Sequence, residues 1–131
     1  EAAVARELQA LPGIALAVSS SALRAGALPD TKISRAVRAN FHPDRSGDIY
    51  VVFEPHWFVA DFDGLTVASA HGSPWTYDSH VPIIIAGEGV TPGVVQRRVE
   101  TVDVAATIAA KMRTNPPSGA VGIPLIEAFE P

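Results

Sequence analysis

Short apolar runs alternate along the chain with segments of helical spacing, and this alternation limits the folds that the chain can adopt. Three of the runs are short, end at turn residues and are typical of buried strands; they lie at residues 14–18, 49–53 and 82–86. Residues 57–60 could form a further short strand. The helical segments lie at residues 2–11, 31–40 and 102–112. Alternating strands and helices predict a layered α/β domain.

The chain has the length and apolar content of one compact domain. It has 131 residues, of which 47% are hydrophobic, and no internal repeat or domain boundary is evident. We therefore expect a single domain over residues 1–131. The apolar stripe of the last helical segment predicts that this helix packs against the sheet through Val102, Ile108, Ala109 and Met112.

Composition and charge exclude several classes of function. The net charge of −4 argues against binding to a nucleic-acid backbone, which requires a basic surface. The chain has no cysteine, which excludes disulfides and thiolate metal sites. No apolar run is long enough for a membrane span.

The loop at residues 71–80 holds the strongest candidate for metal binding. A neutral imidazole is a good zinc ligand, and His71 stands beside a Gly-Ser-Pro turn in front of the apolar run. Tyr77, Asp78 and His80 are close in sequence and could orient this ligand or its loop. Ordinary hydrogen bonds that stabilise the loop are the other interpretation of all three. No residue is predicted to be catalytic, because the serines at 19–21 lack a nucleophile elbow.

Several segments together resemble the alkaline phosphatase superfamily, and specifically its type I phosphodiesterase and nucleotide pyrophosphatase branch. The HGS segment at residues 71–73 is similar to the family's C-terminal motif. Residues 100–109 (ETVDVAATIA) are similar to its VDIAPTLA helix, with Ala106 in place of the usual proline. The remaining similar segments are RSGDI at residues 45–49, PSG at 117–119 and GIPL at 122–125.

The resemblance implies that this chain is the C-terminal part of a zinc-dependent phosphohydrolase. Such enzymes hydrolyse phosphate monoesters or diesters with two zinc ions and a threonine or serine nucleophile, and the resemblance makes His71 a zinc ligand. The other ligands and the nucleophile are not found in this sequence. The N-terminal part of the same protein would supply them and would be the partner of this chain. The resemblance also implies a periplasmic or extracellular location.

Two interpretations remain open. In the first, the longer parent protein is a zinc-dependent phosphatase or phosphodiesterase, and the isolated chain binds zinc weakly or not at all and is inactive. The chain begins at Glu1 within a segment of helical spacing, which also suggests a piece of a longer protein. In the second, the chain is a non-catalytic binding or interaction module that keeps the superfamily's shape. The sequence does not distinguish a monoester from a diester substrate.

Overall fold

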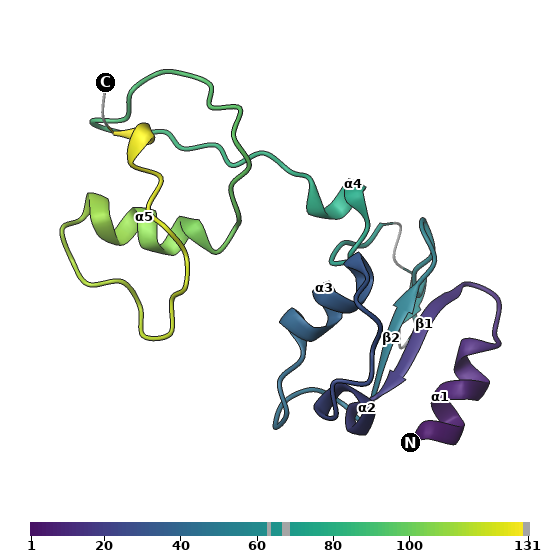
Figure 1. Ribbon diagram of the computed structural model, residues 1–131. Coiled ribbons are helices and arrows are strands. Elements are labelled where there is room, and N and C mark those ends of the chain that lie inside the picture. Colours follow the sequence, from purple (N-terminus) through teal and green to yellow (C-terminus); the bar gives the residue numbers. More distant parts are fainter. Residues whose placement is uncertain (63, 67–68, 130–131) are drawn as a thin grey trace. The chain divides into compact units, whose positions relative to one another are not determined.

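A computed structural model describes residues 1–62, 64–66 and 69–129 of the chain (Figure 1). The chain forms two compact units, Glu1–Val81 and Pro82–Pro131. The expectation of a single domain over residues 1–131 stays a prediction.

The first unit is built around a two-stranded antiparallel sheet. Strand β1 (Ile14–Ser19) pairs with β2 (Ile49–Phe53), and Val18 lies opposite Tyr50 in the register. The helices of this unit are α1 (Ala2–Gln9), α2 (Ser20–Arg24), α3 (Lys32–Asn40) and the short α4 (Thr76–Ser79). A small second hairpin joins β3 (Asp61–Phe62) to β4 (Leu65–Thr66).

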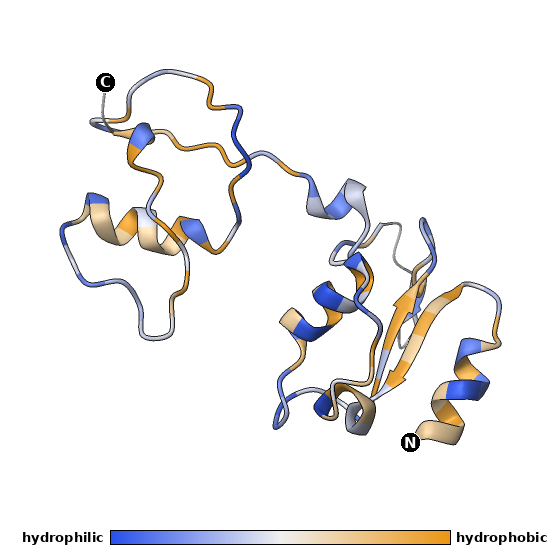
Figure 2. Ribbon diagram, viewed as in Figure 1, coloured by the Kyte–Doolittle hydropathy of each residue, from blue (hydrophilic) through white to orange (hydrophobic). Residues whose placement is uncertain are grey.

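Apolar side chains from the sheet and two of the helices form the core of the first unit. The buried cluster comprises Val18, Leu23, Val37 and Val52, and the orange strands in Figure 2 show the apolar character of the sheet. Helix α1 packs along β1, where the side chain of Gln9 accepts a hydrogen bond from the backbone N–H of Ala17 at 2.8 Å. Thr31 is the N-cap residue of α3, and its hydroxyl accepts a hydrogen bond from the N–H of Ser34.

The strands at 14–18 and 49–53 and the helices at 2–11 and 31–40 are thus confirmed, apart from a residue or two at their ends. The strand expected at residues 57–60 is wrong. That stretch is irregular, and the chain enters a strand only at Asp61.

The second unit consists of α5 (Asp103–Lys111), a 3-10 turn (Ile126–Ala128) and long connecting segments. The strand expected at residues 82–86 is wrong, because this stretch pairs with no strand among the described residues and Ile84 is 85% exposed. A strand exists only where a neighbouring strand completes its hydrogen bonds, and the described part of this unit offers none.

The helix at 102–112 is confirmed, but the prediction of which side chains pack it against the rest of the protein is mostly wrong. Val102, Ile108 and Met112 are exposed, the last of them by 70%. The buried side of α5 instead carries Ala109, as expected, together with the residues Asp103, Ala106 and Thr107. The buried Asp103 and Thr107 bind the C-terminal segment by hydrogen bonds, so polar pairing and not the apolar stripe decides which side faces inward.

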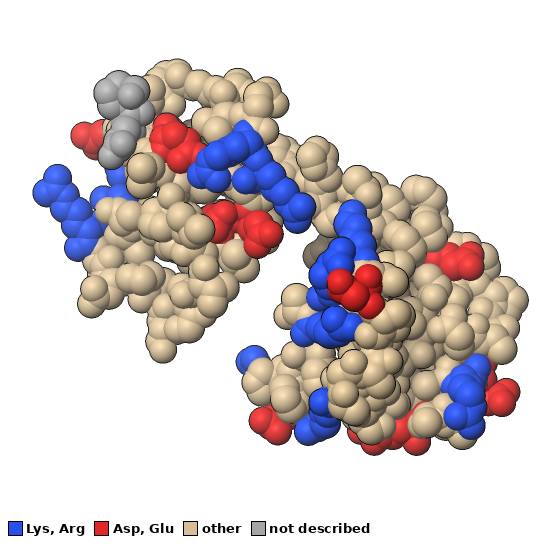
Figure 3. All heavy atoms as spheres, viewed as in Figure 1, with Lys and Arg blue, Asp and Glu red and all other residues tan. Residues whose placement is uncertain are grey.

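Charged side chains of both signs are mixed on the face of the molecule in Figure 3. One exposed pair joins Arg35 to Asp30 at 2.8 Å, and an ion pair in water of this kind adds little stability. None of the described helices has the length and apolar character that crossing a membrane would need.

Candidate metal-ligand site around His71

His71 lies in an irregular loop that leads into α4, and its side chain is exposed to solvent. The next residue, Gly72, has φ 98°, a backbone conformation that glycine adopts without strain. The chain bends at Pro74 and Trp75, just before α4. An exposed imidazole in such a loop can present a ring nitrogen to a metal ion without a rearrangement of the core.

A carboxylate braces this loop from within α4. Asp78 Oδ2 accepts two hydrogen bonds from Ser73, one from its N–H at 2.9 Å and one from its hydroxyl at 2.6 Å. The hydroxyl bond and then the N–H bond are the main reasons that the pKa of Asp78 lies below its usual value, and His71 contributes less to this shift. The carboxylate thus stays ionised and connects α4 to Ser73, two residues beyond His71.

The indole of Trp75 attaches the same loop to the sheet. Its Nε1–H donates a hydrogen bond to the carbonyl oxygen of Phe53, the last residue of β2, at 2.9 Å. Trp75 also stands at the N-terminus of α4 and packs against the core cluster. The loop that carries His71 is therefore held at both the helix and the sheet.

The other two residues near His71 in sequence serve different contacts. The hydroxyl of Tyr77 accepts a hydrogen bond from the N–H of His56 at 3.0 Å, and the two rings stack with centroids 4.8 Å apart. The sequence analysis does not single out His56, and no spacing pattern indicates this stacking. The backbone N–H of His80 donates to the carbonyl oxygen of Thr76 and ends α4. That Tyr77, Asp78 and His80 orient His71 stays a prediction.

We expect the removal of the Ser73 hydroxyl to raise the pKa of Asp78. In Ser73→Ala the carboxylate loses the hydrogen bond that contributes most to its stabilisation in the charged form, while the backbone N–H bond remains. The control is Ser79→Ala, because the Ser79 hydroxyl makes no hydrogen bond to another described residue. A carboxyl titration of Asp78 followed by NMR measures the shift. An equal pKa of Asp78 in the two variants would mean that the Ser73 hydroxyl does not stabilise its carboxylate.

A complete metal site is not assembled by the described residues. Among residues 1–62, 64–66 and 69–129, no group of three or more histidine, aspartate or glutamate side chains is placed to hold one ion. A zinc ion is usually held by three or four protein ligands. That His71 is a zinc ligand stays a prediction.

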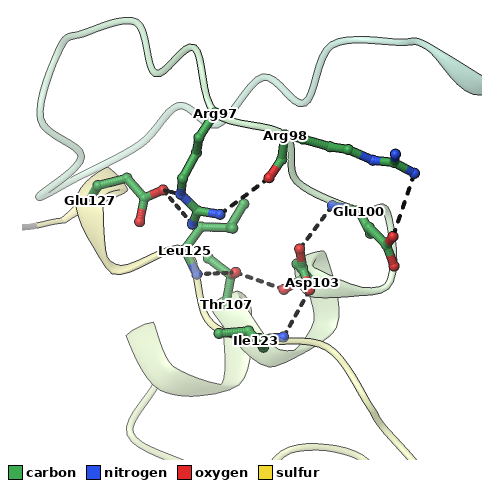
Figure 4. A network of polar contacts seen from close by, with 8 residues as sticks. All are labelled: Arg97, Arg98, Glu100, Asp103, Thr107, Ile123, Leu125 and Glu127. Carbon is green, nitrogen blue, oxygen red and sulfur yellow. Dashed lines mark hydrogen bonds and ion pairs between the residues drawn. The ribbon is translucent and has the colours of Figure 1, made fainter.

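The second unit contains a polar network that stabilises the start and the buried side of α5 (Figure 4). Asp103 accepts hydrogen bonds from the N–H groups of Glu100 at 2.9 Å and Ile123 at 2.8 Å. These two bonds are the main reasons that the pKa of Asp103 lies below its usual value, and Arg97 adds to the shift. The carboxylate thus ties the C-terminal segment to the first turn of the helix.

Thr107 continues this attachment one turn further along α5. It is the most deeply buried polar residue among those described, 1% exposed, and its Oγ1 donates to the carbonyl oxygen of Asp103 at 2.7 Å. The same oxygen accepts the N–H of Leu125 at 2.9 Å. Sequence reasoning missed this role of Asp103 and Thr107. The signal was a polar pair four residues apart, which places both on one side of a helix.

Arg97 extends the network to the 3-10 turn. Its guanidinium donates from Nε to Glu127 Oε1 at 2.7 Å, and Arg98 pairs more loosely with Glu100 at 3.8 Å. Figure 4 shows Arg97 and Arg98 pointing to different partners. The contacts of this network connect α5 to the segment before it and to the C-terminal segment.

Comparison with known proteins finds relatives and solved structures that match the chain, although no family model matches it. The calcium-transporting ATPase of Myroides odoratus is 33% identical over 129 residues, which make up 98% of this chain and 23% of that protein. Alkaline phosphatase PhoV of Synechococcus elongatus is 30% identical over 110 residues, 84% of this chain and 19% of that protein. A crystal structure of alkaline phosphatase PafA matches with a TM-score of 0.76 and 27% identity, over 98% of this chain and 24% of that chain.

The predicted α/β fold class is confirmed by this match, and the fold is that of part of an alkaline phosphatase. The chain is a homologue of alkaline phosphatases over most of its own length. It spans between about a fifth and a quarter of the length of the relatives that it matches.

Proposed function

We propose that this chain is the C-terminal part of a zinc-dependent phosphohydrolase, to which it contributes His71 as one zinc ligand. The observation that carries the proposal is the match of 98% of the chain to the PafA structure, at 27% identity. The ATPase named among the relatives is compatible with it, because ATP hydrolysis also transfers a phosphoryl group to water. The longer enzyme of which this chain would be a part is called the parent protein.

In the parent protein, two zinc ions would activate the nucleophile and stabilise the leaving oxygen of a phosphate monoester or diester. The role of His71 in this scheme is to bind one ion through a neutral ring nitrogen. The hydrogen bonds of Ser73 to Asp78 and of Trp75 to Phe53 keep the loop that carries it in one conformation. A ligand held in place in this way loses little conformational freedom when the metal binds.

The N-terminal part of the parent protein would supply the nucleophile and the remaining ligands. From the resemblance of its segments, we propose that the chain belongs to the type I phosphodiesterase and nucleotide pyrophosphatase branch. A periplasmic or extracellular location follows from the same proposal.

The isolated chain should bind zinc weakly and should not hydrolyse phosphate esters. One imidazole competes poorly with water and buffer for the ion, and no activated nucleophile accompanies it. Incubation of the purified chain with zinc and a chromogenic phosphate ester tests this expectation, and zinc binding is followed by calorimetry. Turnover that requires zinc and is lost in His71→Ala would mean that the chain carries a complete site and would overturn the proposed division of ligands.

A further inference from the structure

Half of the basic residues of the chain lie in one stretch of the first unit. Residues 24–45 hold five of the ten lysines and arginines and only two carboxylates, so this stretch has a net charge of +3. The rest of the first unit, residues 1–23 and 46–81, has one basic and seven acidic residues, a net charge of −6. The positive charge is therefore local, although the chain as a whole is acidic.

Helix α3 carries three of these cations on its exposed side. Lys32, Arg35 and Arg38 recur every three residues and are exposed, whereas Ser34 and Val37 are buried. The helix contains no aspartate or glutamate. Figure 3 shows basic side chains close together, with acidic ones among them, in the region of α3. Neighbouring cations repel one another, and Lys32 in the first turn opposes the helix dipole, so this arrangement does not serve the stability of the helix.

Two arginines in this region are oriented by neutral partners. The guanidinium of Arg38 donates a hydrogen bond to the carbonyl oxygen of Leu28. The guanidinium of Arg24 donates to the carbonyl oxygen of Pro43 and lies 5.9 Å from the ring centroid of Phe41, the C-cap residue of α3. A carbonyl oxygen or an aromatic ring positions a guanidinium without cancelling its charge. Arg24 therefore adds a fourth cation at the C-terminal end of the helix.

The positive charge of this region is only weakly compensated. Arg35 pairs with Asp30 at 2.8 Å, but the two side chains are 60% and 73% exposed. An ion pair in water is weak, so another anion can replace Asp30 at little cost. Lys32 makes no ion pair with a described residue. We call Arg24, Lys32, Arg35 and Arg38 the cationic row.

A narrow chain of phosphate groups fits the cationic row better than a broad anionic surface does. Helix α3 has nine residues and is about 13 Å long, which leaves room for several consecutive phosphates. A membrane or a nucleic-acid duplex would extend past the row and meet the acidic rest of the first unit. Single-stranded nucleic acid binds through aromatic side chains on which its bases stack, and α3 contains none. The planar guanidinium matches the oxygens of a phosphate.

We propose that the cationic row binds a linear chain of phosphate groups, of which inorganic polyphosphate is the simplest example. Its four cations contact successive phosphates along the exposed side of α3. This binding goes beyond the proposed function, because it requires neither zinc nor His71.

Titration calorimetry of the 131-residue chain with short inorganic polyphosphate, in the absence of zinc, tests the proposal. Four phosphate contacts predict that the logarithm of the binding constant falls with the logarithm of the salt concentration with a slope of about −3. The combined substitution Lys32→Gln, Arg35→Gln and Arg38→Gln should weaken binding at least about 30-fold at low salt and bring the slope to about −0.7. Glutamine favours a helix about as well as lysine and arginine do. An absence of binding to the unaltered chain at low salt would overturn the proposal.

The control variant changes the net charge by the same amount outside the row. Arg6→Gln, Arg98→Gln and Arg113→Gln together, all at exposed positions, should weaken binding by less than about threefold. An equal loss in the two triple variants would contradict the proposal, because net charge alone would then explain the binding. Lys32→Gln by itself should reduce the slope by about 0.7, so the test does not depend on the stability of the triple variant.

Single-stranded DNA with the same number of phosphates tests the choice of ligand. It should bind to the unaltered chain at least about tenfold more weakly than polyphosphate, because its bases find no aromatic side chain on α3. Equal affinity for the two polymers would overturn the assignment to a simple phosphate chain.

Discussion

Gly122→Ala should destabilise the second unit of the chain and lower its free energy of unfolding by about 3 kcal/mol. A methyl group at this position would lie 2.1 Å from the carbonyl oxygen of Val102 and 2.7 Å from the Cα of Asp103. Both atoms belong to the backbone at the start of α5, so no side-chain rotation relieves the clash. The C-terminal segment would have to move away and would lose the hydrogen bonds that Ile123 and Leu125 donate to α5.

The control for this prediction is Gly93→Ala in the same unit. A methyl group on Gly93 meets no atom within 4 Å, so the substitution should change stability by no more than about 0.5 kcal/mol. Amide exchange of α5 and thermal unfolding measure the two variants side by side. Equal stability would mean that the C-terminal segment does not pack closely on the helix.

In the parent protein, His71→Ala should lower zinc affinity by at least about 100-fold and should lower the phosphohydrolase rate with it. The substitution removes a ligand and also changes the charge and geometry around the remaining ion. Zinc content measured by atomic absorption and the initial rate of phosphate ester hydrolysis, both on the same preparation, give the two readouts.

His80→Ala is the matched control, because it removes an imidazole nine residues away in the same loop region. This substitution should reduce both zinc affinity and hydrolysis rate by less than about tenfold, because it changes only how well the loop is ordered. An equal loss in the two variants, or no loss in His71→Ala, would show that His71 is not the ligand.

The elements predicted well from the sequence are those whose partners lie within the same unit. Most residues of β1 and β2 are β-branched or otherwise apolar. The two strands pair with each other and share a core with Val37 of α3, so the local pattern and the structure agree. Residues 82–86 have an equally strong strand pattern but lack a partner among the described residues. A local pattern reports the preference of a segment and cannot report whether a neighbouring strand is present.

The candidate site also combines features that a local pattern predicts with features that depend on distant partners. The loop position of His71 agrees with the sequence analysis, and its role as a ligand stays a prediction. The stacking of Tyr77 on His56 joins α4 to a turn 21 residues earlier in the chain, which no spacing rule predicts. On α5, the burial of Asp103 and Thr107 depends on backbone donors near the C-terminus, so the apolar stripe was a poor guide to the buried side.

The central claim is that His71 binds zinc, and anomalous diffraction from crystals of the parent protein at the zinc absorption edge tests it most directly. We expect an anomalous peak about 2.0–2.1 Å from a ring nitrogen of His71, with the other ligands contributed from outside these 131 residues. Zinc peaks that all lie beyond about 4 Å from the His71 ring, where no coordinate bond is possible, would contradict the claim.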